Sequence, residues 1–334
     1  MIYIVDGTGP DDDAKYNADM TRGFCSHINN QIKNSVYFRG PNISGLTTWQ
    51  IADCLFENII IDVNRAPSAP IILVGHSRGG SACIYIARKL KNRGVKVRAL
   101  ILFDAVRRAI QHSPEEYFQK VISGSHGAPL LLGVLGAFAA VDIALDYFQI
   151  GNSEIDKIPS NVEIALHVTR NEDFSNYFIN CLEWKNLTAK ISDATKKGKA
   201  CDVEKLRLKR LLQFHKNLRD ACRFNCIGPL TGLSTGFGFA NTGLSAESGC
   251  RLLPIIKNTF MASHGAMGGA PIRVSSYIDD ASYAALIESQ EIISMLGVQC
   301  RVNGFLKEIG VYGEIKLDYV PATFSANQSQ TAIK

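Results

Sequence analysis

The sequence predicts an α/β fold with a mostly parallel central sheet and helices on both faces. Short apolar segments rich in β-branched residues, which suit strands buried on both sides, alternate with amphipathic segments that suit helices. The expected strands are residues 2–5, 35–39, 71–74, 97–106, 161–170 and 310–320. The expected helices are residues 48–63, 81–91, 202–223 and 283–296. At 334 residues the chain is long enough for a single domain, residues 1–334, with inserted segments.

Composition and charge are those of an ordinary globular protein. The formal net charge is +5 without a dense Lys/Arg block, so we expect no nucleic-acid partner. The nine cysteines are scattered, and several, such as Cys54 and Cys83, lie in apolar segments; this pattern predicts buried free thiols in a reducing compartment. Cys222 and Cys226 lack the further ligands that a zinc site needs, and we expect no metal and no cofactor. Without a signal peptide, we expect cytoplasmic synthesis and, for any export, a signal-less route.

One stretch, residues 70–80, carries the strongest functional signal. An apolar run ends in Gly-His-Ser-Arg-Gly at residues 75–79, and a segment that suits a helix follows. Strand, Gly-x-Ser-x-Gly and helix in this order form the nucleophile elbow of serine hydrolases, a tight and strained turn with the serine at its tip. The two glycines are needed because side chains there would collide. Ser77 is therefore the predicted nucleophile, and an ordinary strand-to-helix turn is the alternative.

The first predicted strand ends in a Gly-rich turn, Asp-Gly-Thr-Gly at residues 6–9. In α/β hydrolases, such a turn and the residue after the nucleophile supply the backbone N–H groups of the oxyanion hole. We assign this role to Arg78 together with Thr8 or Gly9. The alternative is a plain turn, followed by a solvated acidic loop at residues 11–13.

Two further residues complete the order Ser, Asp, His along the chain. Asp104 follows four apolar residues near the carboxyl end of its predicted strand, where parallel sheets keep their sites and where an unpaired carboxylate would be costly. His264 lies far downstream in a loop of small residues, which suits an imidazole that approaches the elbow. The candidate triad is Ser77, Asp104 and His264. Asp173, one strand later, is the alternative acid, and His126 is the alternative histidine.

Long segments are inserted between the predicted elements. Residues 107–160 form a lid-like insertion whose uncharged run, 127–141, is shorter than the ~20 residues of a membrane span; a buried helix and an apolar lid that contacts lipid are both open. Residues 180–255 form a cap with a helix and a Gly-rich, mobile loop. The basic helix 202–223 suits either an anionic membrane surface or a solvated face. Residues 322–334 predict a disordered tail.

Taken together, these motifs resemble the hydrolase domain of the type VI secretion lipase effectors, a bacterial family. The matching stretches are residues 6–8 (Asp-Gly-Thr), 75–79 (the Gly-x-Ser-Arg-Gly elbow), 103–106 (Phe-Asp-Ala-Val for Phe-Asp-Thr-Val), 167–173 (a loose echo of His-Ala-x-x-x-Asp-Glu) and 264–269 (the spacing of His-Ser-Asp-Val-Gly-Gly). Through these short motifs in matching order, the resemblance covers about half of the chain. His76 stands where that family usually has an aromatic residue, and Gly265 and Ala266 replace its Ser-Asp, which removes polar groups suited to position the loop or hold a cation.

The resemblance implies an α/β-hydrolase-like fold and a triad of Ser77, Asp104 and His264 that cleaves phospholipid or other lipid esters through an acyl-enzyme. The departures from the family concern the substrate rather than the hydrolase chemistry. A thioesterase and a small-ester hydrolase use the same triad and are the alternatives within the enzyme class. A catalytically silent α/β-hydrolase fold that binds or docks on membranes is the alternative from another class. We expect a lipid or other ester substrate and peripheral membrane contact, while the sequence indicates no particular protein partner.

Overall fold

A parallel sheet forms the centre of the structure, a computed structural model that describes residues 1–10, 12–41, 47–106, 153–171, 182–207, 209, 241–271 and 281–317. Seven strands of the described residues pair in the order β2-β1-β3-β4-β6-β8, with β9 also on β6. Every pair in this sheet is parallel. The strands are β1 (Ile2–Val5), β2 (Ser35–Phe38), β3 (Ile72–His76), β4 (Val97–Phe103), β6 (Val162–Arg170), β8 (Arg251–Leu252) and β9 (Thr259–Phe260).

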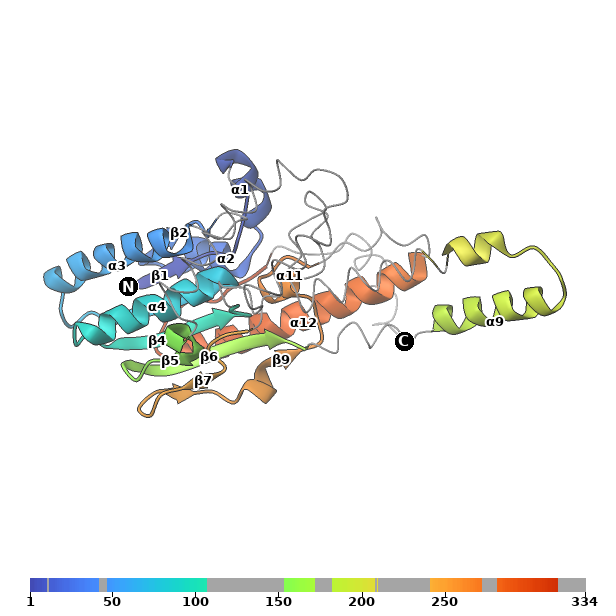
Figure 1. Ribbon diagram of the computed structural model, residues 1–334. Coiled ribbons are helices and arrows are strands. Elements are labelled where there is room, and N and C mark those ends of the chain that lie inside the picture. Colours follow the sequence, from blue (N-terminus) through green and yellow to red (C-terminus); the bar gives the residue numbers. More distant parts are fainter. Residues whose placement is uncertain are drawn as a thin grey trace, which may run out of the picture.

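Helices cover both faces of the sheet (Figure 1). On one face α2 (Phe24–Gln31) and α12 (Ala281–Glu308) share a core cluster with Ile2 and Ile4 of β1, whereas on the other face α3 (Thr48–Arg65) and α4 (Arg78–Asn92) share one with Tyr3 and Val5. Successive side chains of a strand point to opposite faces, so the apolar run of β1 serves both layers. The α/β class predicted from the sequence is confirmed.

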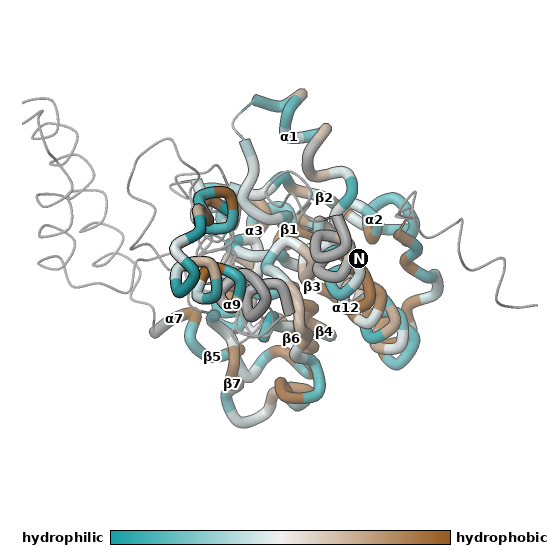
Figure 2. The backbone as a smooth tube through the Cα atoms, turned by 90° about the vertical axis from the view of Figure 1, so that its right-hand side faces the viewer, coloured by the Kyte–Doolittle hydropathy of each residue, from teal (hydrophilic) through white to brown (hydrophobic). Residues whose placement is uncertain are grey.

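The middle strands are mostly apolar because both of their faces are covered. Figure 2 shows hydrophobic stretches along β3 and β6 between the helices. Every residue of β4 except Arg98 is buried. Burial of each Leu, Ile or Val side chain contributes about 1.5–3 kcal/mol, so this sheet supplies much of the driving force for folding. In the described part of the chain, no helix has both the length and the hydrophobicity that a bilayer crossing requires.

The described ends of the two predicted insertions meet beside α4. After α7 (Ser153–Asp156), the short strand β5 (Lys157–Ile158) pairs in parallel with β7 (Ser245–Ala246). Glu247 forms ion pairs with Arg88 and Lys91 of α4, at 2.5 Å each, and accepts the backbone N–H of Ser160 at 2.9 Å. These contacts lower the pKa of Glu247 to about 2, the hydrogen bond from Lys91 most strongly. Both insertions are therefore anchored on the helix that follows the elbow.

Other parts of the insertions are only partly described. From the cap, α9 (Leu182–Lys196) lies apart from the sheet (Figure 1), and residues 202–207 are helical, as predicted for the start of the basic helix. The apolar run 127–141 and the tail 322–334 lie outside the described residues.

Two sequence predictions for local structure are wrong. The predicted strand 310–320 is absent from its described part, residues 310–317. This segment packs the fully buried Ile315 against the core, and the side chain of Asn303 bonds both the N–H and the C=O of Ile315, at 2.8 and 2.9 Å. A side chain of α12 thus supplies the hydrogen bonds that a neighbouring strand would make, and the alternation of residues reflects packing on a helix.

In the acidic stretch near the N-terminus, residues 12 and 13 are exposed, as expected, but they cap and begin a helix and do not form a loop. The side chain of Asp12 accepts the N–H of Lys15 at 2.8 Å and caps α1 (Asp13–Met20). Asp is favoured at this position because its oxygen satisfies a free N–H of the first turn, and Asp13 also suits the positive end of the helix dipole. Cys54 corrects another expectation, since it lies on the solvent side of α3 and is exposed, although Cys83 is buried and both are free thiols.

Two glycines make the packing around the elbow testable. A Cβ on Gly79 would lie 2.3 Å from the carbonyl oxygens of Val5 and Asp6, whereas a Cβ on Gly304 in α12 would meet no atom within 4 Å. We expect Gly79→Ala to lower the free energy of unfolding by about 1–3 kcal/mol because the backbone must move. Gly304→Ala should leave it unchanged or raise it by up to about 1 kcal/mol. Urea unfolding measures both, and equal midpoints for Gly79→Ala and wild type would contradict the packing.

Candidate active site

The strand order places one edge of the sheet where parallel folds bind ligands. The chain runs from β1 to β2 and then crosses back past β1 to β3, so the connections leave β1 and β3 in opposite directions. Sites of such sheets lie at the carboxyl ends of the strands at this switch point. The register aligns the ends of β1, β3, β4 and β6 at one edge. Asp6, Ser77, Asp104 and Arg170 follow or close these strands and therefore lie in a row.

Ser77 occupies the tip of a strained turn between β3 and α4. Its backbone has φ 55° and ψ −126°, in a region that non-glycine residues rarely adopt. A Cβ on Gly75 would lie 2.5 Å from the carbonyl oxygen of Gly79, so the turn requires glycine there. The N–H of Ser77 donates to Phe103 O at 3.0 Å, which fixes the turn to the end of β4. Strain of this kind costs about 1–3 kcal/mol and persists where surrounding contacts impose it.

Asp104 and His264 form a buried pair beside this turn. His264 Nδ1 lies 2.6 Å from Asp104 Oδ2, and Asp104 is fully buried with φ 45°. The same carboxylate accepts the side chain and the backbone N–H of Arg170 and the amide of Asn241. Burial raises the pKa of Asp104, but Arg170, His264 and Asn241 outweigh it and hold the pKa below its ordinary value. Asp104 is therefore a carboxylate at neutral pH.

The hydrogen bond to Asp104 determines the state of the imidazole. Because the carboxylate can only accept, Nδ1 of His264 carries the proton, and Nε2 is then a free acceptor in the neutral ring. Nε2 of His264 and Oγ of Ser77 are both buried, and neither has a hydrogen-bond partner among the described residues. The structure thus brings a basic nitrogen and an unpaired hydroxyl to the same edge of the sheet.

His76, which precedes the serine, fills the space between two glycine-containing turns. Its ring lies 5.1 Å from the ring of His264, centroid to centroid. A Cβ on Gly7 or on Gly268 would come within 2.4 Å of its ring atoms. Burial and the neighbouring His264 lower the pKa of His76 to about 3. His76 is therefore a neutral ring that packs at the position where the family resembled by this sequence usually has an aromatic residue.

A second buried histidine fixes the backbone after Asp104. His167 Nε2 accepts the N–H of Ala105 at 3.0 Å, so its Nδ1 carries the proton and donates to Gly243 O at 3.2 Å. Burial lowers the pKa of His167 to about 4. Gly243 and Asn241 belong to the Gly-rich segment expected to be a mobile loop. The described end of that segment is instead held in the site, because its polar groups bond to the end of β4.

The structure distinguishes between the two residues proposed for the first turn. The N–H of Gly9 donates to Pro41 O at 3.1 Å and is already used. Oγ1 of Thr8 is buried without a hydrogen-bond partner among the described residues. Arg78, which directly follows the candidate nucleophile, is the first residue of α4. Thr8 and Arg78 are therefore the better pair of candidate oxyanion donors.

Some residues of the site were predicted and others were not. The two alternatives, Asp173 and His126, lie outside the described residues. Sequence reasoning missed Arg170 and Asn241, which both contact Asp104. A signal existed for Arg170, a charged residue that closes an alternating buried strand at the same edge. In the described ranges, no cluster of three or more His, Cys, Asp or Glu residues could hold a metal ion.

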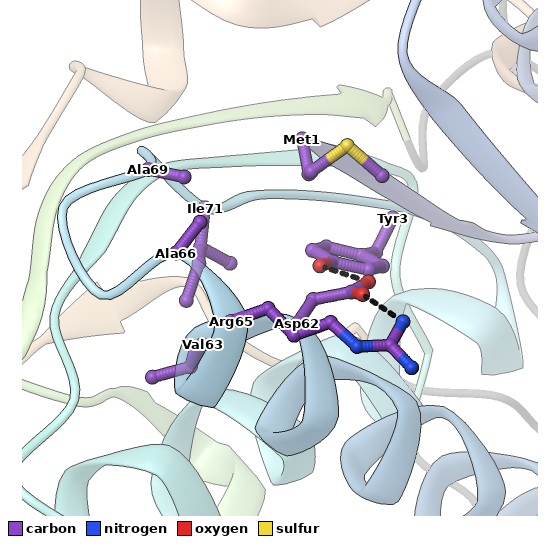
Figure 3. A pocket seen from close by; sticks show the side chains of 8 residues that line it. All are labelled: Met1, Tyr3, Asp62, Val63, Arg65, Ala66, Ala69 and Ile71. Carbon is purple, nitrogen blue, oxygen red and sulfur yellow. Dashed lines mark hydrogen bonds and ion pairs between the residues drawn. The ribbon is translucent and has the colours of Figure 1, made fainter.

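A separate hollow lies at the opposite edge of the sheet (Figure 3). It has a volume of about 180 Å³ and is lined by the start of β1, the end of α3 and residues 66–71. Tyr3 donates its hydroxyl to Asp62 at 2.9 Å, and Arg65 lies 3.9 Å from the same carboxylate. These residues lie at the amino ends of the strands, whereas the candidate active site lies at their carboxyl ends. The hollow is therefore not part of the candidate active site.

Asp6 gives a prediction for the dependence of stability on pH. Its carboxylate is buried, accepts Tyr37 Oη–H at 2.6 Å and Gly7 N–H at 2.7 Å, and lies 3.9 Å from His76 Nδ1. Burial raises its pKa to about 6 despite these hydrogen bonds. The folded state then holds a proton that the unfolded state releases, so the contribution of Asp6 to stability is complete below pH ~4 and is lost as the pH rises to ~6.

We therefore expect the stability difference between wild type and Asp6→Asn to change with pH. Relative to Asp6→Asn, the wild type should lose about 2 kcal/mol of unfolding free energy between pH 4 and pH 6. Urea unfolding of both proteins at several pH values measures the difference, with Asp193→Asn on the exposed surface of α9 as the control. A difference that is constant, or that grows in favour of the wild type, would contradict this assignment.

Comparison with known proteins finds distant structural similarity. No known family model and no curated protein sequence matches the chain. The type II thioesterase YbtT of yersiniabactin biosynthesis aligns at 15% identity and TM-score 0.27, over 51% of this chain and 73% of that chain. Human thioesterase 2 aligns at 12% and 0.28, over 51% and 74%. The thioesterase RedJ from Streptomyces coelicolor aligns at 12% and 0.28, over 51% and 70%. At such TM-scores, the description of the fold as α/β-hydrolase-like rests on strand order and elbow.

Proposed function

We propose that the protein is a serine hydrolase that cleaves carboxylic ester bonds of lipids, phospholipids above all, through an acyl-enzyme. The observation that carries this proposal is the pair of Asp104 and His264, 2.6 Å apart, beside the strained Ser77 at the carboxyl edge of the sheet. A serine hydroxyl is a weak nucleophile unless a base takes its proton, and the base needs a third group to orient it. Asp104 orients His264, and the unpaired Nε2 of His264 and Oγ of Ser77 are the two groups that the proton transfer would join.

The mechanism follows from the protonation states. Nε2 of His264 removes the proton from Ser77 as Oγ attacks the ester carbonyl carbon. The carboxylate of Asp104 orients the ring and stabilises the imidazolium that forms. The imidazolium then gives its proton to the leaving alkoxide, so that an alcohol departs and an acyl-serine remains. Water, deprotonated by the same nitrogen, attacks the acyl carbon; the bond from that carbon to Ser77 Oγ then breaks, the imidazolium returns the proton to Oγ, and a carboxylic acid is released.

The negative oxygen of the tetrahedral intermediate needs donors placed in advance. The backbone N–H groups of Thr8 and Arg78 serve as this oxyanion hole, one from the turn after β1 and the other from the start of α4. The hydroxyl of Thr8 is a third donor at the same place. Such fixed donors contribute about 2.7–4 kcal/mol each to the stabilisation of a transition state.

The lipid part of the proposal has separate support. The motifs at residues 6–8, 75–79 and 264–269 resemble those of lipase effectors, and the uncharged run 127–141 has the composition of an apolar lid. An apolar surface next to the site would bind acyl chains and the membrane surface from which they come. We extend the proposal to peripheral membrane contact.

Labelling with a fluorophosphonate tests the chemistry. Wild type should react covalently and Ser77→Ala should not, while Asp104→Asn and His264→Ala should react slower by roughly 10³–10⁴-fold because the base is lost or misoriented. Asp53→Asn, an exposed carboxylate on α3, is the matched control and should react at the wild-type rate. Folded wild-type protein that fails to react both with and without detergent would contradict a hydrolase and favour a silent binding module.

Substrates then separate the lipid proposal from its alternatives. Release of fatty acid from phospholipid vesicles by wild type, and not by Ser77→Ala, is the expected result. Cleavage of acyl thioesters or short-chain esters without any release from vesicles would contradict the lipid proposal and leave a thioesterase or a small-ester hydrolase.

A further inference from the structure

The loop that carries His264 is attached to α12 by a buried carboxylate. Glu291 of α12 is fully buried and accepts two hydrogen bonds from Ser263, from the backbone N–H at 2.5 Å and from Oγ–H at 2.6 Å. Ser263 caps the short helix α11 (His264–Met267), because its Oγ also accepts the N–H of Ala266 at 3.2 Å. Glu291 therefore fixes the residue directly before the imidazole.

Other contacts fix the loop on both sides of this point. Gln290 and Ser294, on the same helix, donate to Met261 O at 3.2 and 2.9 Å. After the histidine, Gly268 O accepts the N–H of Phe24 at the start of α2 at 2.8 Å. Of these groups, Glu291 is the one that binds Ser263, the residue directly before His264, and it does so through two hydrogen bonds.

The chemistry of Glu291 suits this task. A fully buried carboxylate is costly unless strong hydrogen bonds compensate for its desolvation, so packing alone does not account for it. Its two oxygens can take two donors of one residue at once. In addition, Gly265 and Ala266, directly after the histidine, offer no polar side chains. Glu291 supplies the polar anchor that these two residues lack.

We infer that Glu291 is a positioning residue that holds His264 against Asp104 and toward Ser77 by way of Ser263. This inference rests on the proposed function, in which His264 is the general base. Loss of the two hydrogen bonds frees Ser263 to rotate, and the imidazole of the next residue then shifts with it. A displacement of about 1 Å at a catalytic group lowers a rate by roughly 100-fold.

Three variants separate positioning from a merely structural role. Glu291→Leu removes both acceptors, whereas Glu291→Gln keeps an oxygen for the N–H of Ser263 and an amide that can donate to its Oγ. Asn303→Leu is the matched control on the same helix, since Asn303 also makes two hydrogen bonds to one residue, Ile315, far from the site. Urea unfolding of all three measures the structural cost of each change.

In the hydrolase assay we expect kcat of Glu291→Leu to fall about 100-fold with KM nearly unchanged, because substrate contacts remain. Glu291→Gln should recover most of this loss, and Asn303→Leu should keep the wild-type kcat even where it lowers stability. A folded Glu291→Leu protein with wild-type kcat would overturn the inference. So would an equal loss of kcat in Asn303→Leu, since that would show a general effect of a weakened α12.

A second readout does not depend on activity. The Nδ1 proton of His264, hydrogen-bonded to Asp104, gives a low-field ¹H NMR resonance that His264→Ala and Asp104→Asn remove. Glu291→Leu should broaden or shift this resonance, while Glu291→Gln and Asn303→Leu should preserve it. If the wild type has no hydrolase activity, the proposed function fails, and this resonance still decides the positioning role. An unchanged resonance in Glu291→Leu overturns that role whatever the activity is.

Discussion

The carboxylate of Asp104 is completely buried, and three residues donate hydrogen bonds to it. A buried charge without partners costs several kcal/mol, which a protein of ordinary stability cannot sustain. His264, Arg170 and Asn241 come from three separate parts of the chain and meet at this one group. Formation of the site is therefore coupled to completion of the fold, because each donor arrives only when its own element has packed.

Strain at the carboxyl edge is sustained by the regular sheet behind it. Both Ser77 and Asp104 have positive φ angles, 55° and 45°, directly after neighbouring parallel strands. The apolar residues of β3 and β4 contribute burial energy on two faces, while close backbone contacts at Gly75 and Gly79 leave the turn no relaxed alternative. The result is a serine whose backbone conformation is imposed by its surroundings. At the same edge of the sheet, the hydrogen bond to Asp104 keeps the proton of His264 on Nδ1.

The parts of this arrangement that follow local rules could be predicted from the sequence. Strand, turn and helix around Ser77 have strong local patterns, and the carboxylate and histidine lie in turns of recognisable composition. Asn241 and Glu291 could not be predicted, because their roles arise from contacts across 137 and 28 residues of chain. The strand prediction for residues 310–320 was wrong because an alternation of apolar and polar residues indicates only which side chains are buried. A segment that packs against a helix can show the same alternation as a strand.

The central claim is that Ser77 attacks an acyl carbon while His264 takes the proton of Ser77. The N–H groups of Thr8 and Arg78 bind the oxygen of the same acyl group. A crystal structure of the protein after reaction with a lipid-like alkylphosphonate tests this claim most directly. The account predicts phosphorus bonded to Ser77 Oγ, a phosphonyl oxygen within hydrogen-bonding distance of the N–H groups of Thr8 and Arg78, and His264 Nε2 facing the serine oxygen. Phosphorus on another residue, or an imidazole turned away from Ser77, would contradict it.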